Sequence, residues 1–203
     1  IHIGKCGGST IKRQLLLNNV SFNHVHIKKP IYGSKKKYII IIRNPIKRFI
    51  SAWNWRKYNI CKNQDCNKDQ LKVLNRNTLD EFASNLYDNK NNLTFNLNTK
   101  IPHINPKGID FYLNDLLDNV DKKQIIGVIT QENLENDYKN TFNINFNEEL
   151  GSYKKNKAVS DTYLSSKSLN NLKMFLENDY KCIEKLNNMG LLSSKQYKDL
   201  TKY

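Results

Sequence analysis

The sequence predicts an α/β domain in which helices flank a central, mostly parallel sheet. Two apolar runs, 38–42 and 124–129, are rich in β-branched residues, which is typical of strands covered on both faces. Each run is followed at once by a helix signal, and alternation of strands with helices favours parallel pairing. The length of 203 residues suits one compact domain. We therefore expect a single domain over residues 1–203.

The first residues have the pattern of a strand that leads into a turn of small residues. Residues 1–3 (IHI) are apolar at alternate positions, and 5–10 (KCGGST) form the turn. Ser9 is a suitable N-cap for a helix that extends to Leu17. Apolar side chains recur in it at helical spacing: Ile11, Leu15 and Leu16. Because the chain opens on a strand, we expect further sequence upstream of it.

The next segment predicts two strands and a second helix. Alternation over 22–27 (FNHVHI) favours a short strand, and 38–42 (YIIII) a central one. Arg43 ends that strand, while Asn44 and Pro45 read as the N-cap and first residue of a helix. This helix would bury four apolar residues in the core: Ile46, Phe49, Ile50 and Trp53.

The middle of the chain is polar and broken by one helix. We expect an insertion or loop over 59–77 and an Asn- and Pro-bearing loop over 88–108. Between them a helix is predicted at 78–87, where Thr78 and Glu81 have the spacing of a capping box.

The last part of the chain adds two helices around a basic loop. A helix of about 132–142 should follow the strand at 124–129, and a long helix should occupy about 168–188. The loop between them, 151–160, contains three lysines, Lys154, Lys155 and Lys157.

Positive charge dominates the composition. The chain has 33 Lys and Arg against 19 Asp and Glu, a formal net charge of +14. Such a surplus favours an anionic partner: nucleic acid, a phosphorylated cofactor, a sulfated or acidic glycan, or a lipid surface. Charge alone does not choose among them, and a solvated basic surface is the simpler alternative. No apolar run approaches the ~20 residues of a membrane span, so we expect none in this chain.

The cysteine count excludes a disulfide scaffold. Four cysteines in a chain of this length are too few for one. Cys61 and Cys66 are spaced to close a small loop in an oxidising compartment, and free thiols are the alternative. Further ligands at zinc-site spacing are missing around them, so we expect no metal.

The first candidate site is the turn at 5–10. A glycine-rich turn that feeds a helix exposes backbone N–H groups at the positive end of the helix dipole, which suits a phosphate. A nucleotide triphosphatase loop would carry its lysine after the glycines, whereas Lys5 precedes them. The order disfavours a triphosphatase but permits a related phosphate-binding geometry. A purely structural Gly-Gly turn is the alternative.

The second candidate site lies at the end of the 38–42 strand. In open α/β sheets, ligands bind at the carboxyl ends of the strands. Arg43 offers a forked donor for a phosphate there, and Ser51 follows with a hydroxyl two helical turns later. An ordinary capped helix would explain Pro45, but not an arginine at the end of a buried strand.

Together these two segments resemble a known family. HIGKCGGST and IIRNPIKRFISAW are similar to motifs of the sulfotransferases that use 3′-phosphoadenosine 5′-phosphosulfate (PAPS), in particular the carbohydrate, heparan-sulfate-type branch. GVITQE at 127–132 and FLENDY at 175–180 resemble two weaker family segments. The resemblance covers most of the chain and implies the sulfotransferase fold with a P-loop-like phosphate-binding turn.

The resemblance also implies where the donor binds. The turn would hold the 5′-phosphosulfate, with Lys5 at the bridging oxygen and leaving phosphate. Its residues are Lys5, Cys6, Gly7, Gly8, Ser9 and Thr10. Arg43 and Ser51 match the pair that holds the 3′-phosphate. Lys155 and Lys157 match a loop that closes over it, more loosely, and a solvated basic loop is equally compatible. Asn44 departs from the family, which usually has Asp there.

The catalytic base and the acceptor contacts follow from the same comparison. Family members place a catalytic His or Glu on the strand after the first helix, which indicates His24. His26 shares its side of the strand and is the alternate candidate; both could instead be strand histidines without a role. His103, Trp55 and Arg56 are candidate acceptor contacts, with an ordinary loop residue as the alternative for His103.

These observations predict transfer of a sulfuryl group from PAPS to an acceptor hydroxyl, most simply on a glycan, by in-line displacement without a metal. A basic nucleic-acid-binding module and a nucleotide phosphotransferase are the alternatives. The Lys-before-Gly order and the missing Mg²⁺-binding acidic motif argue against the phosphotransferase. The resemblance implies the Golgi lumen or membrane for a eukaryotic member and the cytoplasm otherwise. The acceptor position and the oligomeric state stay open.

Overall fold

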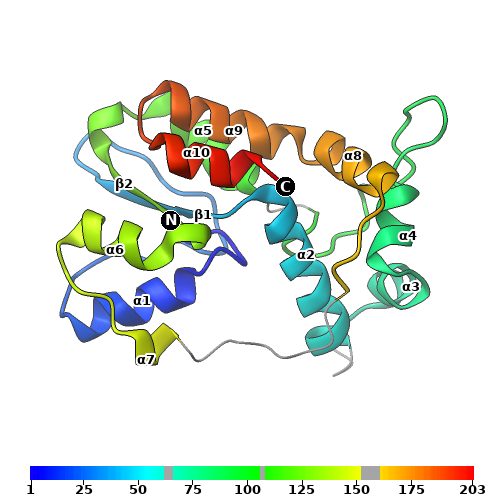
Figure 1. The fold of residues 1–203 in the computed structure, drawn as a ribbon, viewed down its shortest axis with the longest axis horizontal. Helices are drawn as coiled ribbons and strands as arrows, with labels where there is room; N and C mark the ends of the chain where they lie inside the picture. The colour runs from blue at the N-terminus through cyan, green and yellow to red at the C-terminus, as the bar shows by residue number, and fades with distance from the viewer. Residues whose placement is uncertain (62–65, 106–107, 152–160) are drawn as a thin grey trace.

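A small parallel sheet lies at the centre of the molecule, with helices around it (Figure 1). The computed structural model describes residues 1–61, 66–105, 108–151 and 161–203. Strands β1 (Tyr38–Ile42) and β2 (Ile125–Thr130) pair in parallel. His2 bridges to Ile41, so the first residues lie along the other side of β1. The predicted α/β class is confirmed, and both predicted buried strands are present.

The helices alternate with these strands along the chain. They are α1 (Gly8–Leu17), α2 (Pro45–Trp55), the π-helical η1 (Arg56–Ile60), α3 (Lys68–Arg76), α4 (Leu79–Ser84), α5 (Ile109–Asn119), the 3₁₀ turns η3 (Lys122–Gln124) and η4 (Gln131–Asn133), α6 (Leu134–Phe142), α7 (Glu148–Gly151), α8 (Ser166–Phe175), α9 (Glu177–Asn188) and α10 (Ser194–Thr201).

The predicted starts of two helices are confirmed. The Asn44 side chain accepts from Lys47 N, and Pro45 is the first residue of α2. At α4, Thr78 and Glu81 form the predicted capping box. Helix α1 begins two residues earlier than predicted, at Gly8, because the N-cap is Gly7, in the left-handed conformation, instead of Ser9.

Four predictions of local structure were wrong or incomplete. Residues 22–27 form no strand. Individual hydrogen bonds hold this segment, such as the one from His2 N to Val25 O at 2.8 Å. The 59–77 segment contains α3, whose apolar side chains pack on the cluster around Phe49. The predicted long helix is two helices, α8 and α9, separated at Leu176. Helices α5 and α10 have no counterpart among the predicted elements.

Two apolar clusters support the fold. One surrounds the sheet and includes the faces of α1, α5, α9 and α10 that are turned toward it. The other joins α2, α4 and α8, with Phe49 and Trp53 fully buried as predicted. Tyr180 packs against both clusters. A single domain over residues 1–203 stays a prediction.

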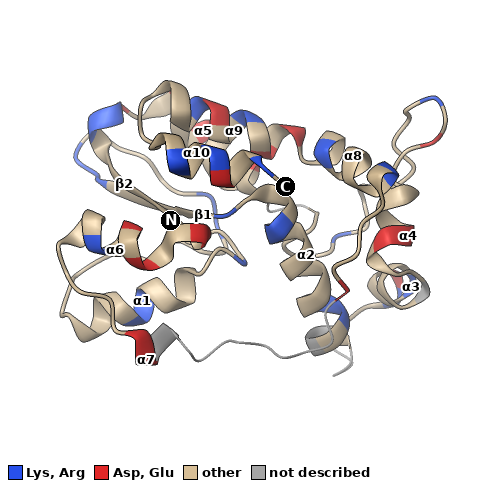
Figure 2. Ribbon diagram, viewed as in Figure 1, with Lys and Arg blue, Asp and Glu red and all other residues tan. Residues whose placement is uncertain are grey.

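The remaining sequence expectations concern cysteines, membranes and charge. Cys61 and Cys66 form a disulfide, whereas Cys6 and Cys182 are buried free thiols. Among the described residues, no helix is both long and apolar enough to cross a membrane. Lysines and arginines are spread over several elements, including α10 and the connection before β1 (Figure 2).

Asn44 joins the C-terminal end of the chain to the centre. It is fully buried, and its amide Nδ2 donates to Leu200 O at 2.9 Å and to Lys202 O at 3.3 Å. An aspartate, the usual family residue at this position, has no hydrogen to donate to these carbonyl oxygens. An asparagine at position 44 can therefore hold the C-terminal end of α10 by hydrogen bonds, whereas an aspartate cannot.

We expect Asn44→Asp to destabilise the fold. A buried carboxylate facing carbonyl oxygens should lower the free energy of unfolding by about 2–4 kcal/mol. Urea denaturation measures this change. Thr78→Ala, which removes an exposed helix cap only, is the matched control and should cost about 1 kcal/mol. An Asn44→Asp protein as stable as the unchanged chain would contradict this role.

Candidate functional site

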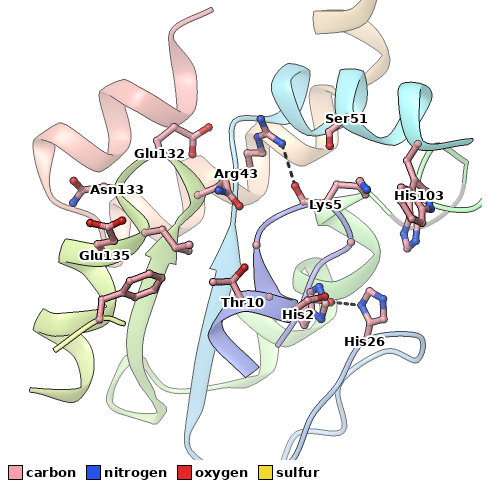
Figure 3. Close-up of a pocket in the computed structure, with 18 of the residues that line it drawn as sticks. His2, Lys5, Thr10, His26, Arg43, Ser51, His103, Glu132, Asn133 and Glu135 are labelled. Atoms are coloured by element: carbon pink, nitrogen blue, oxygen red, sulfur yellow. Dashed lines mark hydrogen bonds between the residues drawn. The ribbon is translucent and has the colours of Figure 1, made fainter. Parts of the chain in front are cut away.

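A cavity of about 1120 Å³ opens at the carboxyl ends of β1 and β2. It is lined by residues from the start of α1, the end of β1, helix α2, the turn at 101–105 and the β2–α6 connection. The predicted site residues that line it are Lys5, Gly7, Gly8, Ser9, Thr10, His26, Arg43, Ser51, Trp55 and His103. Figure 3 shows several of these side chains converging from different elements. Segments far apart in the sequence thus meet at one place.

The turn before α1 has an unusual backbone. Lys5 has φ +70° and Gly7 has φ +87°, both in the left-handed region. A glycine adopts this conformation without cost, whereas a lysine does so with strain that surrounding structure must hold. The turn presents the N-terminus of α1 to the cavity, and no side chain caps this helix. N–H groups in the first turn of a helix have no intrahelical acceptor, so those of Gly8 and Ser9 are available to an anion.

Cys6 is part of the same turn but does not line the cavity. Its side chain is fully buried, with Sγ 3.8 Å from Gly4 O, and its N–H donates to Ile3 O at 3.3 Å. Burial raises the pKa of the Cys6 thiol to about 12, so it stays protonated. Its role is to pack the turn onto the core.

Arg43 lies at the end of β1 beside the half-buried carboxylate of Glu132. Its Nη1 is 3.4 Å from Lys5 O, which links the strand end to the turn (Figure 3). Glu132 Oε1 accepts from Asn44 N at 3.2 Å, and burial raises the pKa of Glu132 despite the nearby Arg43 guanidinium. Arg43 Nε and Glu132 Oε2 are buried and have no hydrogen-bond partner among the described residues. Both atoms are therefore left for a bound molecule or water.

Helix α2 brings Ser51 and Trp55 to the cavity one turn apart. Both residues line it, and the Trp55 ring faces Lys5, with Nζ 4.3 Å from the ring centroid. A lysine ammonium over an aromatic face is a cation–π contact. Trp55 therefore holds the Lys5 side chain on the side of the cavity where His103 lies.

All four histidines of the chain gather at this end of the molecule. The His2 and His26 rings stack with centroids 4.0 Å apart, and His24 and His103 each lie 5.8 Å from His26. Burial lowers the pKa of His2 to about 3 and that of His103 to about 4. These two rings are uncharged at neutral pH. Among the described residues, no group of three or more His, Cys, Asp or Glu is placed to hold a metal ion.

The hydrogen bond of His26 fixes its tautomer. Its Nδ1 is 2.8 Å from the backbone oxygen of His2, which only accepts, so Nδ1 carries the hydrogen. Nε2 is then the basic nitrogen. His24 does not line the cavity; its ring is exposed, and its Nε2 is 2.9 Å from His2 Nδ1. The predicted strand is absent here, but the ring centroids of His24 and His26 lie 5.8 Å apart.

Two arginines hold the turn that carries His103. Arg48 Nη1 donates to His103 O at 2.8 Å, and Arg56 Nε donates to Pro102 O at 3.2 Å. His103 itself has φ +71°, and its ring lies against Gly4. Its Nδ1 is buried and has no hydrogen-bond partner in the part of the chain that the structure describes. Arg56 does not line the cavity. Its side chain stabilises this turn through the hydrogen bond to Pro102 O. Lys155 and Lys157 lie outside the described residues.

Sequence reasoning missed one wall of the cavity and one histidine. The wall is the β2–α6 connection with part of the following segment: Gln131, Glu132, Asn133, Leu134, Glu135, Asn136, Phe146 and Glu148. The GVITQE segment was matched to the family, but no site role was assigned to it. His2 also lines the cavity, and the signal for it was its place two residues before the Gly4-Lys5 turn.

The substitution Trp55→Leu tests whether the cation–π contact with Lys5 contributes to turnover. Such contacts contribute about 0.5–2 kcal/mol, so we expect turnover to fall by about 10-fold as Lys5 loses its position. Trp55→Phe, which keeps an aromatic face, should fall less. Initial rates at saturating donor measure this. Equal losses in both variants would contradict the contact and leave side-chain size as the cause.

The comparisons with known proteins agree with this geometry. A model described as the sulfotransferase family matches residues 1–183. The chain therefore belongs to the sulfotransferase family. No curated protein and no solved structure matches it.

The match covers β1, β2 and every element that lines the cavity. It establishes an enzyme that transfers sulfuryl groups to a hydroxyl-bearing acceptor. It does not distinguish branches of the family by donor or acceptor class.

Proposed function

We propose that this chain transfers a sulfuryl group from PAPS to a hydroxyl of a glycan, with His26 as the base. The observation that carries the proposal is the meeting of the turn at Lys5, the Arg43 guanidinium, Ser51 and the His26 ring in one cavity. The reaction needs positive charge at the leaving phosphate, a fixed acceptor, and a proton acceptor near its hydroxyl.

The cavity wall formed by the turn, β1 and α2 fits a nucleotide with two phosphate sites. Uncapped N–H groups of α1 and the Lys5 ammonium would hold the 5′-phosphosulfate. The Arg43 guanidinium, whose buried Nε has no hydrogen-bond partner among the residues described, and the Ser51 hydroxyl would hold the 3′-phosphate. Glu132 lies beside Arg43, with Oε1 3.2 Å from Asn44 N, whereas Glu135 lies farther from Arg43 in Figure 3. The uncharged nucleoside would lie toward Glu135.

The donor supplies an activated sulfuryl group, and the protein supplies position and charge. The acceptor oxygen forms a bond to sulfur while the bond from sulfur to the bridging phosphate oxygen breaks. Lys5 and the α1 N–H groups stabilise the negative charge that develops on the leaving phosphate. The acceptor proton moves to His26 Nε2, which is free because Nδ1 is bonded to His2 O. His24 lies outside the cavity, where its ring contacts those of His2 and His26.

The acceptor would enter beside the histidines. His103 presents a buried Nδ1 that lacks a partner, which suits a hydrogen bond to an acceptor hydroxyl. Trp55 adds an aromatic face at the same rim, and sugar rings pack well on such faces. The net charge of +14 favours a glycan that carries acidic groups.

Transfer of ³⁵S from labelled PAPS to a panel of acceptors tests the proposal. The panel contains acidic polysaccharides, neutral oligosaccharides, a small alcohol and a tyrosine peptide. We expect labelled acidic polysaccharide and little label elsewhere. Transfer to the peptide alone would replace the glycan assignment, and no transfer from PAPS to any hydroxyl would refute the donor assignment.

A further inference from the structure

His2 is in contact with both halves of the proposed site. Its N–H donates to Val25 O at 2.8 Å, and its carbonyl accepts from His26 Nδ1 at 2.8 Å. The residue is 7% exposed, and its ring stacks on His26 with 18° between the planes. The His2 backbone therefore binds Val25 and His26, and the His2 side chain covers the His26 imidazole.

The His2 ring also rests on helix α1. A methyl group on Gly8, the first residue of α1, would stand 2.1 Å from His2 Cδ2 and 2.2 Å from Cγ. Only a hydrogen fits there unless the ring moves. The ring is thus packed between the Gly8 backbone on one side and His26 on another, both of which line the cavity.

We propose that the His2 ring is a positioning residue that sets the separation between the first turn of α1 and the His26 imidazole. The inference rests on the proposed function, in which α1 holds the sulfuryl donor and His26 takes the acceptor proton. A small error in this separation would misplace the base relative to the reacting oxygen. The ring acts as a neutral spacer, because burial and the neighbouring histidines lower its pKa to about 3.

Two substitutions of His2 separate a spacer from a proton carrier. His2→Phe keeps a flat ring without nitrogens, whereas His2→Ala removes the ring and keeps the backbone bonds. We expect His2→Ala to lower kcat by about 10- to 100-fold and His2→Phe by no more than about 3-fold. The Kd of 3′-phosphoadenosine 5′-phosphate should stay within about 3-fold in both. Equal losses in the two variants would overturn the spacer role, as would full activity of His2→Ala.

Gly8→Ala supplies a second, independent readout. Alone it should lower kcat by about 10-fold or more, because its methyl group pushes the His2 ring toward His26. In the His2→Ala background the ring is gone, so Gly8→Ala should cost less than about 3-fold. Additive losses would overturn the proposal.

Controls keep the outcomes distinct. Thermal melting establishes which variants are folded. If His2→Ala does not fold, the effect of Gly8→Ala is measured in the His2→Phe protein instead. The proposal then requires Gly8→Ala to cause its full loss of kcat there, because the phenyl ring is still present. An unchanged chain that neither binds the nucleotide nor transfers sulfuryl would refute the proposed function. An active unchanged chain with additive or ring-independent losses would refute this inference alone.

Discussion

His26→Ala is expected to lower turnover by about 10²- to 10⁴-fold while leaving donor binding intact. The reason is local: His26 lines the cavity, and its hydrogen bond to His2 O leaves Nε2 as the nitrogen that can accept a proton. None of its contacts involves the turn at Lys5, so the Kd of the nucleotide product should not change. Single-turnover rates with calorimetry on the same protein measure the two quantities separately.

His24→Ala is the matched control for this experiment. It removes the same chemical group two residues away, from a ring that is exposed and outside the cavity. We expect a loss of less than about 10-fold, transmitted through the bond between His24 Nε2 and His2 Nδ1. If His24→Ala were the inactive protein and His26→Ala the active one, the base would be His24.

Arg43→Ala is expected to weaken binding of 3′-phosphoadenosine 5′-phosphate by about 100-fold. Hydrogen bonds to charged groups contribute about 1.5–3 kcal/mol, and every 1.4 kcal/mol is tenfold in Kd. The Arg43 Nε atom is buried and has no hydrogen-bond partner within the described part of the chain, so folding has already removed water from it. Binding then gains the full contact with the phosphate. Calorimetric titration of the variant gives the change in Kd directly.

Two further variants show whether the loss is specific. Arg43→Lys keeps the charge but not the forked geometry, so it should recover only part of the affinity. Lys173→Ala removes one positive charge from an exposed position on α8, outside the residues that line the cavity. It should change Kd by less than about 2-fold. An equal loss in Lys173→Ala would mean that net charge binds the nucleotide, without a site at Arg43.

The elements next to the site could be predicted because their signals are local. The β-branched run at Tyr38–Ile42 and the Asn44-Pro45 pair fix a strand, a cap and a helix start within a few residues. Those elements place Arg43 and Ser51 in the cavity. The turn at Lys5–Thr10 was readable because glycines permit the left-handed backbone of a tight turn before a helix, although the N-cap is Gly7 instead of Ser9.

The parts that failed depend on contacts made far along the chain. The alternation at 22–27 suggested a strand, but the segment has no continuous partner and is held by His2 and Tyr112. Nothing near Arg56 in the sequence shows that it will hold the turn at Pro102. Helix α5 did have a signal, apolar spacing at Ile109, Leu113, Leu116 and Leu117, that a fuller reading of the 109–119 segment would have found.

The most direct test of the account is a calorimetric titration of the unchanged protein with 3′-phosphoadenosine 5′-phosphate, beside ATP and a mixed-sequence oligonucleotide at the same salt concentration. The cavity joins the α1 N-terminus with Arg43 and Ser51, so we expect one site that prefers the bis-phosphorylated nucleotide to ATP by about 10-fold or more. Equal or tighter binding of ATP or of the oligonucleotide, or no binding of the bis-phosphorylated nucleotide, would contradict the assignment of this cavity to the sulfuryl donor.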